Sequence, residues 1–329
     1  MSKKTYKKVK RETFFQKFTN FVLTLIVACA IGSQMCTAAN NNLRFAQVSD
    51  THFSTFEENT SYKFLKKSPE LFNDVIFQIN TSGPYDFVIF TGDLINKPKK
   101  TELVKFLGLA SKINCPWYAI NGNHDIAFDG PLTKEEFCKI INSHNKHMST
   151  QRLYYAFTPK KGFRVICLDS IIDYKLTSNG EISQEQLMWL KKELDGHKKD
   201  VVIIATHVPF DEPYNSSNHK LNNEDEVKNL LKKYSNPIIV LQGHYHCVRA
   251  KQRENIVYIT SPSLVTFPNA FRVININSNK HRTMVDVFLK ETNLKDIQTR
   301  SRLRLFGVES LYGSEEDRNT TFVIKKHKE

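Results

Sequence analysis

The sequence has no internal repeat and no low-complexity tract, which excludes solenoid, propeller and collagen-like folds. Cysteine is also scarce in the 329 residues: two of the six cysteines precede residue 40, and the other four are widely spaced. Four such cysteines do not make a disulfide scaffold in a chain of this length. We expect them to be mostly structural, with Cys167 in a buried strand.

The body of the chain lacks a basic block. The formal net charge is +13, but seven basic residues against one acidic residue before position 18 supply +6 of it. The remaining charge is spread along the chain, so we expect no specific nucleic-acid binding. A hydrophobic content of 40% and a charged content of 25% are ordinary for a globular protein with one large domain or two small ones.

A long apolar run is also missing, because residues 21–32, FVLTLIVACAIG, are too few for a comfortable membrane span. The basic leader, this short apolar core and the small residues after it predict a signal peptide over residues 1–39, cleaved near Ala38 or Ala39, and an exported protein. An uncleaved anchor is one alternative. Lipidation is another, because IVAC ending at Cys29 loosely resembles a bacterial lipoprotein box. In both alternatives, only the N-terminal segment would contact a membrane.

Beyond residue 42, short runs of branched and aromatic residues alternate with helical patterns. The runs predict strands at 43–48, 86–90, 117–120, 163–168, 201–205 and 237–241. Helical spacing follows Ser68, and capping boxes are predicted at Thr133 with Glu136 and at Ser183 with Gln186. The alternation indicates an α/β fold with a largely parallel core. Further runs at 255–260, 271–276 and 283–289 suggest antiparallel strands added to the same domain.

Metal-ligand side chains follow five of these predicted strands: Asp50 and His52; Asp93; Asn123, His124 and Asp125; His207; His244 and His246. Bound molecules and ions lie at the carboxyl ends of the strands in α/β sheets, so we expect these side chains to share one cleft. A glycine before Asp93, Asn123 and His244 would let the backbone turn sharply there. Each residue alone is ordinary turn or loop chemistry, but five such strand ends together favour a metal site.

Imidazole and carboxylate ligands suit Fe, Mn or Zn, and an aspartate can bridge two ions. Seven candidate ligands with one shared carboxylate therefore favour two divalent ions, which can clamp a phosphoryl group during displacement. The remaining histidines lie outside this pattern and are interpreted as surface residues: His144, His147, His197, His219, His281 and His327.

The motifs DTHF, GDL, GNHD, TH and GHYH, in this order, resemble those of the calcineurin-like metallophosphoesterases. The segment GEISQEQLMWL resembles one in their cyclic-nucleotide phosphodiesterase branch. The resemblance implies a four-layer α/β/β/α sandwich of two mixed sheets with a binuclear site at the strand C-terminal ends. It also implies a ligand set in which Asp93 bridges the ions, with Asp50, His52 and His246 on one ion and Asn123, His207 and His244 on the other.

The same resemblance gives His124 a catalytic role, over the phosphate beside the leaving group, and makes Asp125 the residue that orients its ring. Asn96 stands where purple acid phosphatases place a tyrosine, so an iron-tyrosinate site is not supported. The resemblance implies a catalytic domain over residues 40–290. Residues 291–329 form a C-terminal extension of unknown role, either an added edge structure or a partially ordered end.

The activity implied is that of a metal-dependent phosphoesterase, in which a metal-bridging hydroxide attacks a small phosphoester. A phosphodiester such as a cyclic nucleotide is the favoured substrate. The alternatives are a phosphomonoesterase or pyrophosphate hydrolase that acts on a nucleotide or a lipid headgroup, and a non-catalytic, metal-stabilised binding scaffold. Retention of His124 argues against the scaffold, because a binding surface has no need of a leaving-group histidine. The oligomeric state is left open.

Overall fold

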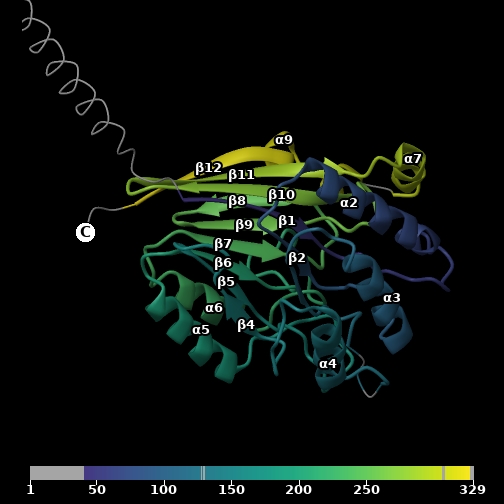
Figure 1. Ribbon diagram of the computed structural model, residues 1–329, viewed down its shortest axis with the longest axis horizontal. Coiled ribbons are helices and arrows are strands. Elements are labelled where there is room, and N and C mark those ends of the chain that lie inside the picture. Colours follow the sequence, from purple (N-terminus) through teal and green to yellow (C-terminus); the bar gives the residue numbers. More distant parts are fainter. Residues whose placement is uncertain (1–40, 127, 129, 306–307, 327–329) are drawn as a thin grey trace, which may run out of the picture. The chain divides into compact units, whose positions relative to one another are not determined.

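The computed structural model describes residues 41–126, 128, 130–305 and 308–326, which belong to one compact unit that begins at Asn41 (Figure 1). The predicted signal peptide or anchor at 1–39, with Cys29, lies outside the described residues, as does His327. No helix in the described part combines the length and the apolar character needed to cross a bilayer.

The first sheet has six strands in the order β12-β11-β10-β1-β2-β3. The neighbours β1, β2 and β3 run parallel, whereas β1 with β10, β10 with β11 and β11 with β12 are antiparallel. The strands are β1 (Asn41–Val48), β2 (Phe87–Thr91), β3 (Trp117–Ile120), β10 (Ala270–Ser278), β11 (Arg282–Glu291) and β12 (Asn319–Lys325).

The second sheet also has six strands, in the order β4-β5-β6-β7-β9-β8. Its four central strands, β5, β6, β7 and β9, are parallel, and β4 and β8 pair antiparallel at its two edges. The strands are β4 (Tyr155–Phe157), β5 (Phe163–Cys167), β6 (Val201–Ala205), β7 (Ile238–Gln242), β8 (Arg249–Arg253) and β9 (Ile256–Thr260).

The nine strands expected from the sequence are all present, but one was given the wrong direction. The run at 255–260 was expected to add an antiparallel strand, and β9 instead pairs parallel with β7. Its antiparallel neighbour is β8, whose polar sequence RAKQR gives no strand signal. In the C-terminal extension, β12 forms the edge of the first sheet, so this part of the extension is an added edge structure.

The predicted helix signals are largely realised. The helices are α2 (Ser68–Ser82), α3 (Lys100–Ala110), α4 (Lys134–His144), α5 (Gln184–Gly196) and α6 (Glu224–Leu231). Thr133 and Glu136 form the full capping box of α4. At α5 only half of the expected box forms: the Ser183 side chain accepts from the Gln186 N–H, but the Gln186 amide binds the backbone of Asp169 instead.

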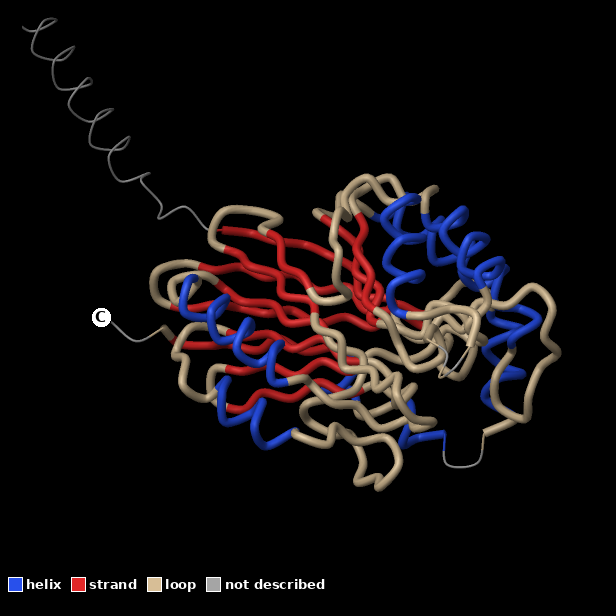
Figure 2. Tube along the Cα trace, turned by 90° about the horizontal axis from the view of Figure 1, so that it is seen from below, coloured by secondary structure: helices blue, strands red, loops and turns tan. Residues whose placement is uncertain are grey.

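Apolar side chains cover both faces of each sheet and form two main clusters. Alternate residues of one set, such as Phe45 and Phe87 of the first sheet and Ile203 of the second, form the core between the sheets. Their sequence neighbours, such as Val88 and Ile204, join the second core with residues of α2 to α6. Figure 2 shows the strands between two groups of helices. The four-layer α/β/β/α sandwich is therefore confirmed.

The rest of the C-terminal extension contains α7 (Lys295–Leu303), α8 (Val308–Tyr312) and α9 (Glu315–Arg318). A fully buried guanidinium fixes this segment to both sheets: Arg272 of β10 donates to the carbonyls of Arg318, Arg249 and Thr260. Burial lowers the pKa of Arg272 to about 10, and the charge of Asp317 opposes that effect. The described cysteines are all free thiols, and Cys167 is buried in β5 as expected.

Candidate metal centre

The predicted site residues meet at the carboxyl ends of five strands, as expected. Asp50 and His52 follow β1, Asp93 follows β2, and the others follow β3, β6 and β7. Backbone hydrogen bonds join the loops to each other: the Asp50 N–H donates to the Gly92 carbonyl, and the His52 N–H donates to the Asp93 carbonyl. The Gly243 N–H donates to the His207 carbonyl. Hydrogen bonds between the loops therefore fix the positions of the side chains.

The backbone at the site is strained. Among the described residues, seven non-glycine residues have positive φ, and five of these are predicted ligands: Asp50 (50°), His52 (39°), Asp93 (49°), His244 (72°) and His246 (52°). This left-handed conformation costs roughly 1–2 kcal/mol for a residue with a Cβ atom. Such outliers concentrate at functional sites, where the surrounding structure holds them in place.

The three glycines before predicted ligands act in two ways, which corrects the expectation of a sharp turn at each. Only Gly92 has positive φ, at +90°. At Gly122 a Cβ atom would overlap Oδ1 of Asp93, and at Gly243 it would overlap Oγ of Ser49 and lie 2.7 Å from Oδ2 of Asp50. These two glycines leave space for the carboxylates.

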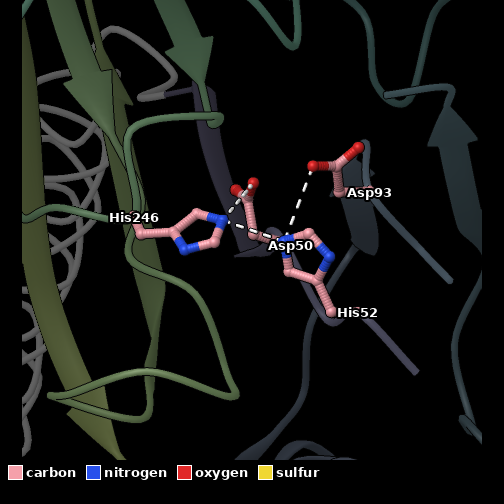
Figure 3. A group of neighbouring side chains, drawn as sticks. All are labelled: Asp50, His52, Asp93 and His246. Atoms are coloured by element: carbon pink, nitrogen blue, oxygen red, sulfur yellow. Dashed lines mark hydrogen bonds and ion pairs between the residues drawn. The ribbon is translucent and has the colours of Figure 1, made fainter. Parts of the chain in front are cut away.

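One group of candidate ligands consists of Asp50, His52, Asp93 and His246, whose ligand atoms all lie within 4.8 Å of one another (Figure 3). Nε2 of His52 is 2.9 Å from Nε2 of His246 and 3.6 Å from Oδ2 of Asp93. Nε2 of His246 is 3.3 Å from Oδ1 of Asp50. Two imidazoles and two carboxylates thus face one point.

A second group consists of Asp93, His207 and His244, again within 4.8 Å of one another. Nε2 of His207 is 3.4 Å from Oδ2 of Asp93 and 3.3 Å from Oδ1 of Asn123. The Nδ1–H of His207 donates to the Thr91 carbonyl at 2.9 Å, which leaves Nε2 as its ligand atom. Asp93 therefore belongs to both groups, and all seven predicted ligands gather around it.

Burial and charge set the protonation states of these side chains before metal binds. Burial lowers the pKa of His52 and of His244 well below the ordinary value, so both rings are neutral. Burial would also lower the pKa of His207, but the charge and hydrogen bond of Asp93 outweigh it and raise that pKa to about 9. Burial opposes ionisation of Asp93, yet His207 and His124 hold its pKa well below its usual range.

The residues fit a divalent cation. The buried Nε2 of His244 has no hydrogen-bond partner among the described residues, although a buried polar atom normally has one. The close pair of His52 and His246 nitrogens likewise suits two lone pairs directed at one cation. These side chains are therefore candidate metal ligands.

His124 lies beside the first group, but Asp125 does not orient its ring, and that expectation was wrong. Nδ1 of His124 donates to the Asn96 carbonyl at 2.7 Å, and its ring meets that of His52 edge-on, with centroids 4.6 Å apart. The Asp125 carboxylate instead accepts the backbone N–H groups of Leu94, Ile95 and Gly122. Three N–H donors satisfy this buried carboxylate and hold the loops after β2 and β3 together.

The centre opens into a pocket of about 310 Å³. Its walls include residues that the sequence analysis did not predict as site residues: Tyr62, Lys63, His219, Tyr245, Leu305 and Leu311. His219 is a surface residue, as expected, but it also lines the pocket, with its ring centroid 5.2 Å from that of His244. Its position in the long loop after His207 was the available signal. A larger hollow of about 400 Å³, beside Lys134 and Arg152, contains none of the candidate ligands.

Comparisons with known proteins agree with this geometry. A family model described as "Calcineurin-like phosphoesterase" matches residues 43–248. The chain is 31% identical over 221 residues to a probable glycerophosphodiester phosphodiesterase, GpdQ, of Arcobacter nitrofigilis, covering 66% of this chain and 77% of that protein. It is 23% identical over 208 residues to the 3',5'-cyclic adenosine monophosphate phosphodiesterase CpdA of Haemophilus influenzae, covering 62% and 70% of the two chains.

Among solved structures, a dimetal phosphatase from Danio rerio superposes with a TM-score of 0.59 at 16% identity, over 87% of this chain and 99% of that one. This likeness supports the fold alone. The family match and the sequence similarity indicate the type of reaction as well, since the family consists of hydrolases that act on phosphoester bonds. The chain belongs to the calcineurin-like phosphoesterase family.

Proposed function

We propose that this protein is a binuclear metal-dependent phosphodiesterase that acts on a small phosphodiester such as a cyclic nucleotide. One observation carries the proposal: the buried carboxylate of Asp93 belongs to both groups of candidate ligands. A carboxylate offers two oxygens, so it can serve two ions at once. The phosphodiesterase names of the two relatives support a diester substrate.

In this proposal each ion has its own ligands as well as Asp93: Asp50, His52 and His246 for one, and Asn123, His207 and His244 for the other. This mixture of nitrogen and oxygen donors suits Fe, Mn or Zn. When bound, such ions lower the pKa of a water molecule and withdraw charge from a phosphoryl group. The chain's own part is to hold these donors in a buried, strained arrangement before substrate arrives.

His124 is the residue that we assign to the leaving group. Its Nδ1–H is held by the Asn96 carbonyl, so Nε2 is the nitrogen left for the substrate. When the ring is protonated, Nε2 can donate a proton to the oxygen that departs with the alcohol. Its backbone N–H also donates to Oδ1 of Asp93 at 2.8 Å, which ties the position of His124 to the shared carboxylate.

The test compares two substrates with the same leaving group. The full chain, loaded with Mn²⁺, is assayed with bis(4-nitrophenyl) phosphate and with 4-nitrophenyl phosphate. We expect faster hydrolysis of the diester. A preference for the monoester would favour the phosphomonoesterase alternative. Absence of turnover on these esters and on a dinucleoside pyrophosphate, with two metal ions bound per chain, would favour the scaffold.

Export is a further part of the proposal. It is supported by the basic leader and short apolar core of residues 1–39, which are features of the sequence. An exported enzyme would meet its phosphoester outside the cytoplasm, or at a membrane surface if the N-terminal segment remains attached.

A further inference from the structure

Lys63 is a buried cation in the wall of the metal-centre pocket. Its side chain is 5% exposed, and its Nζ lies 3.4 Å from Nδ1 of His52. No described carboxylate lies within 4.0 Å of this ammonium group, so it has no ion-pair partner in that part of the chain. Buried lysines are almost always paired, because removing an ammonium group from water is costly.

The position of Lys63 is fixed by its neighbours. The backbone N–H of Lys63 donates to Oγ1 of Thr60 at 2.9 Å, and the Lys63 carbonyl accepts the Thr60 N–H at 3.0 Å. The next residue, Phe64, donates its N–H to the Val265 carbonyl and packs in a small apolar cluster with Ile297 of α7. The C-terminal extension therefore helps to hold this loop against the pocket.

Without metal, distant carboxylates offset part of the cost of burying Lys63. Burial lowers the pKa of Lys63, and the negative charges of Asp93, Asp50 and Glu57 oppose that effect. Metal ligation would cancel the support from Asp93 and Asp50, because both carboxylates would then neutralise cations. The charge of Glu57 would remain, but this carboxylate is paired with Lys97. His52 would no longer accept a hydrogen bond either, since a ring that ligates through Nε2 carries its proton on Nδ1. In the loaded centre the ammonium group thus has no adjacent anion in the described part of the chain.

We propose that Lys63 binds an anionic phosphoryl oxygen of the substrate. This inference rests on the proposed function and adds a group that recognises the substrate's charge. Lys63 lines the same pocket as His124, and the ring of His52 lies close to both, 3.4 Å from Nζ of Lys63 and with its centroid 4.6 Å from that of His124. An oxyanion there would replace the carboxylate charge taken up by the metals, and a tetrahedral phosphate group is the anion of the proposed reaction.

The test uses the full chain with Mn²⁺ bound and measures binding of inorganic phosphate by calorimetry, together with metal content and steady-state kinetics. The test variants are Lys63→Met, which keeps the length without the charge, and Lys63→Arg, which keeps the charge. The matched control is Lys66→Met, which removes an exposed lysine of the same segment that pairs with Glu58.

We expect Lys63→Met to weaken phosphate binding about ten- to a hundredfold and to raise KM by a similar factor, with kcat and metal content close to wild type. Lys63→Arg should retain most of the affinity, and Lys66→Met all of it. Phosphate affinity within twofold of wild type in Lys63→Met would overturn the proposal. Loss of metal from that variant would also overturn it, and would make Lys63 a residue that positions His52.

The two proposals fail separately. If wild-type protein binds phosphate through Lys63 but hydrolyses no phosphoester, the catalytic proposal falls and the anion site stands. If it hydrolyses the diester normally and Lys63→Met has no effect on either phosphate binding or KM, the anion site falls and the catalytic proposal stands.

Discussion

Oδ2 of Asp93 lies 3.4 Å from Nε2 of His207, and both side chains are buried. The pair links the carboxylate common to both ligand groups to a ring whose other nitrogen is fixed by the Thr91 carbonyl. A proton and a metal ion therefore compete for the same nitrogen of His207. The first prediction follows from that competition.

Metal affinity should rise with pH between 7 and 9. Before metal binds, the pKa of His207 is about 9, so this ring is protonated at pH 7 and must release its proton to become a ligand. Release of one proton raises affinity by about tenfold per pH unit until the pKa is passed. Titration of apo-protein with Mn²⁺ by calorimetry, in two buffers of different ionisation enthalpy, measures both quantities. A pH-independent affinity without proton release would contradict this account.

Asp93→Asn should disrupt both metal sites, whereas His52→Ala should chiefly weaken one. The amide keeps the size of Asp93 but removes its charge, and Asp93 is the only residue common to both ligand groups found in the described chain. Affinity should fall by at least about 100-fold for both ions in Asp93→Asn. Elemental analysis after dialysis measures metal per chain, with exposed Asp195→Asn as the control. Wild-type metal content and rate in Asp93→Asn would refute the binuclear assignment.

His124→Ala should keep its metals and lose activity. His124 is not part of either ligand group, and its ring is held by Asn96 beside the first group. Loss of such a group costs about 10²–10⁴ in rate, and more for a poorer leaving group. The defect should therefore be larger on a nucleotide diester than on an activated aryl diester. A variant as fast as wild type on both substrates would show that the ring has another role.

Asp125→Asn should destabilise the fold while leaving the ring of His124 in place. The Asp125 carboxylate accepts three backbone N–H groups, from Leu94, Ile95 and Gly122, and an amide would direct its own N–H groups at one of them. We expect a loss of about 1–3 kcal/mol in the free energy of unfolding. Urea denaturation of the metal-free protein measures this. The control is Asp225→Asn, at an exposed aspartate of α6 whose side chain has no hydrogen bond or ion pair in the described part of the chain. This variant should change stability little, and equal effects in the two variants would count against the assigned role.

Export predicts a processed N-terminus. Mass spectrometry of the protein from its native cell should find a mature chain that starts near residue 39 or 40, or a lipidated Cys29 if the lipoprotein box is functional. An intact Met1 on protein recovered from the cytoplasm would contradict the prediction.

The sequence predicted most of the site because its signals are local. A short apolar run marks a strand, and the residues after it lie at the strand's carboxyl end, so five runs followed by Asp, Asn or His were enough to bring seven ligands together. The direction of β9 was mispredicted because strand direction depends on neighbours in space. Its parallel partner in the sheet is β7, although β8 lies between the two strands in the sequence.

The environments of Lys63 and Asp125 could not be predicted, because they depend on residues that are distant in sequence. Lys63 lies in a loop with no periodic pattern, and its burial depends on Val265 and on α7, both distant in sequence. Asp125 was paired with His124 because the two residues are adjacent. The backbone donors of Leu94 and Ile95, some thirty residues earlier, satisfy its carboxylate instead, and no local rule identifies them.

The left-handed backbone at five of the predicted ligands costs conformational free energy in the folded state, but it places side chains that can bind metal. Glycine at Asp50, Asp93 or His244 would relieve the conformational penalty of the Cβ atom but would remove a ligand. Directed evolution of the metal-free protein for heat resistance alone would therefore show whether this relief outweighs the hydrogen bonds that Asp50 and Asp93 accept from the His244 and His124 N–H groups. A homologue that binds no metal would be free to carry glycine at these positions.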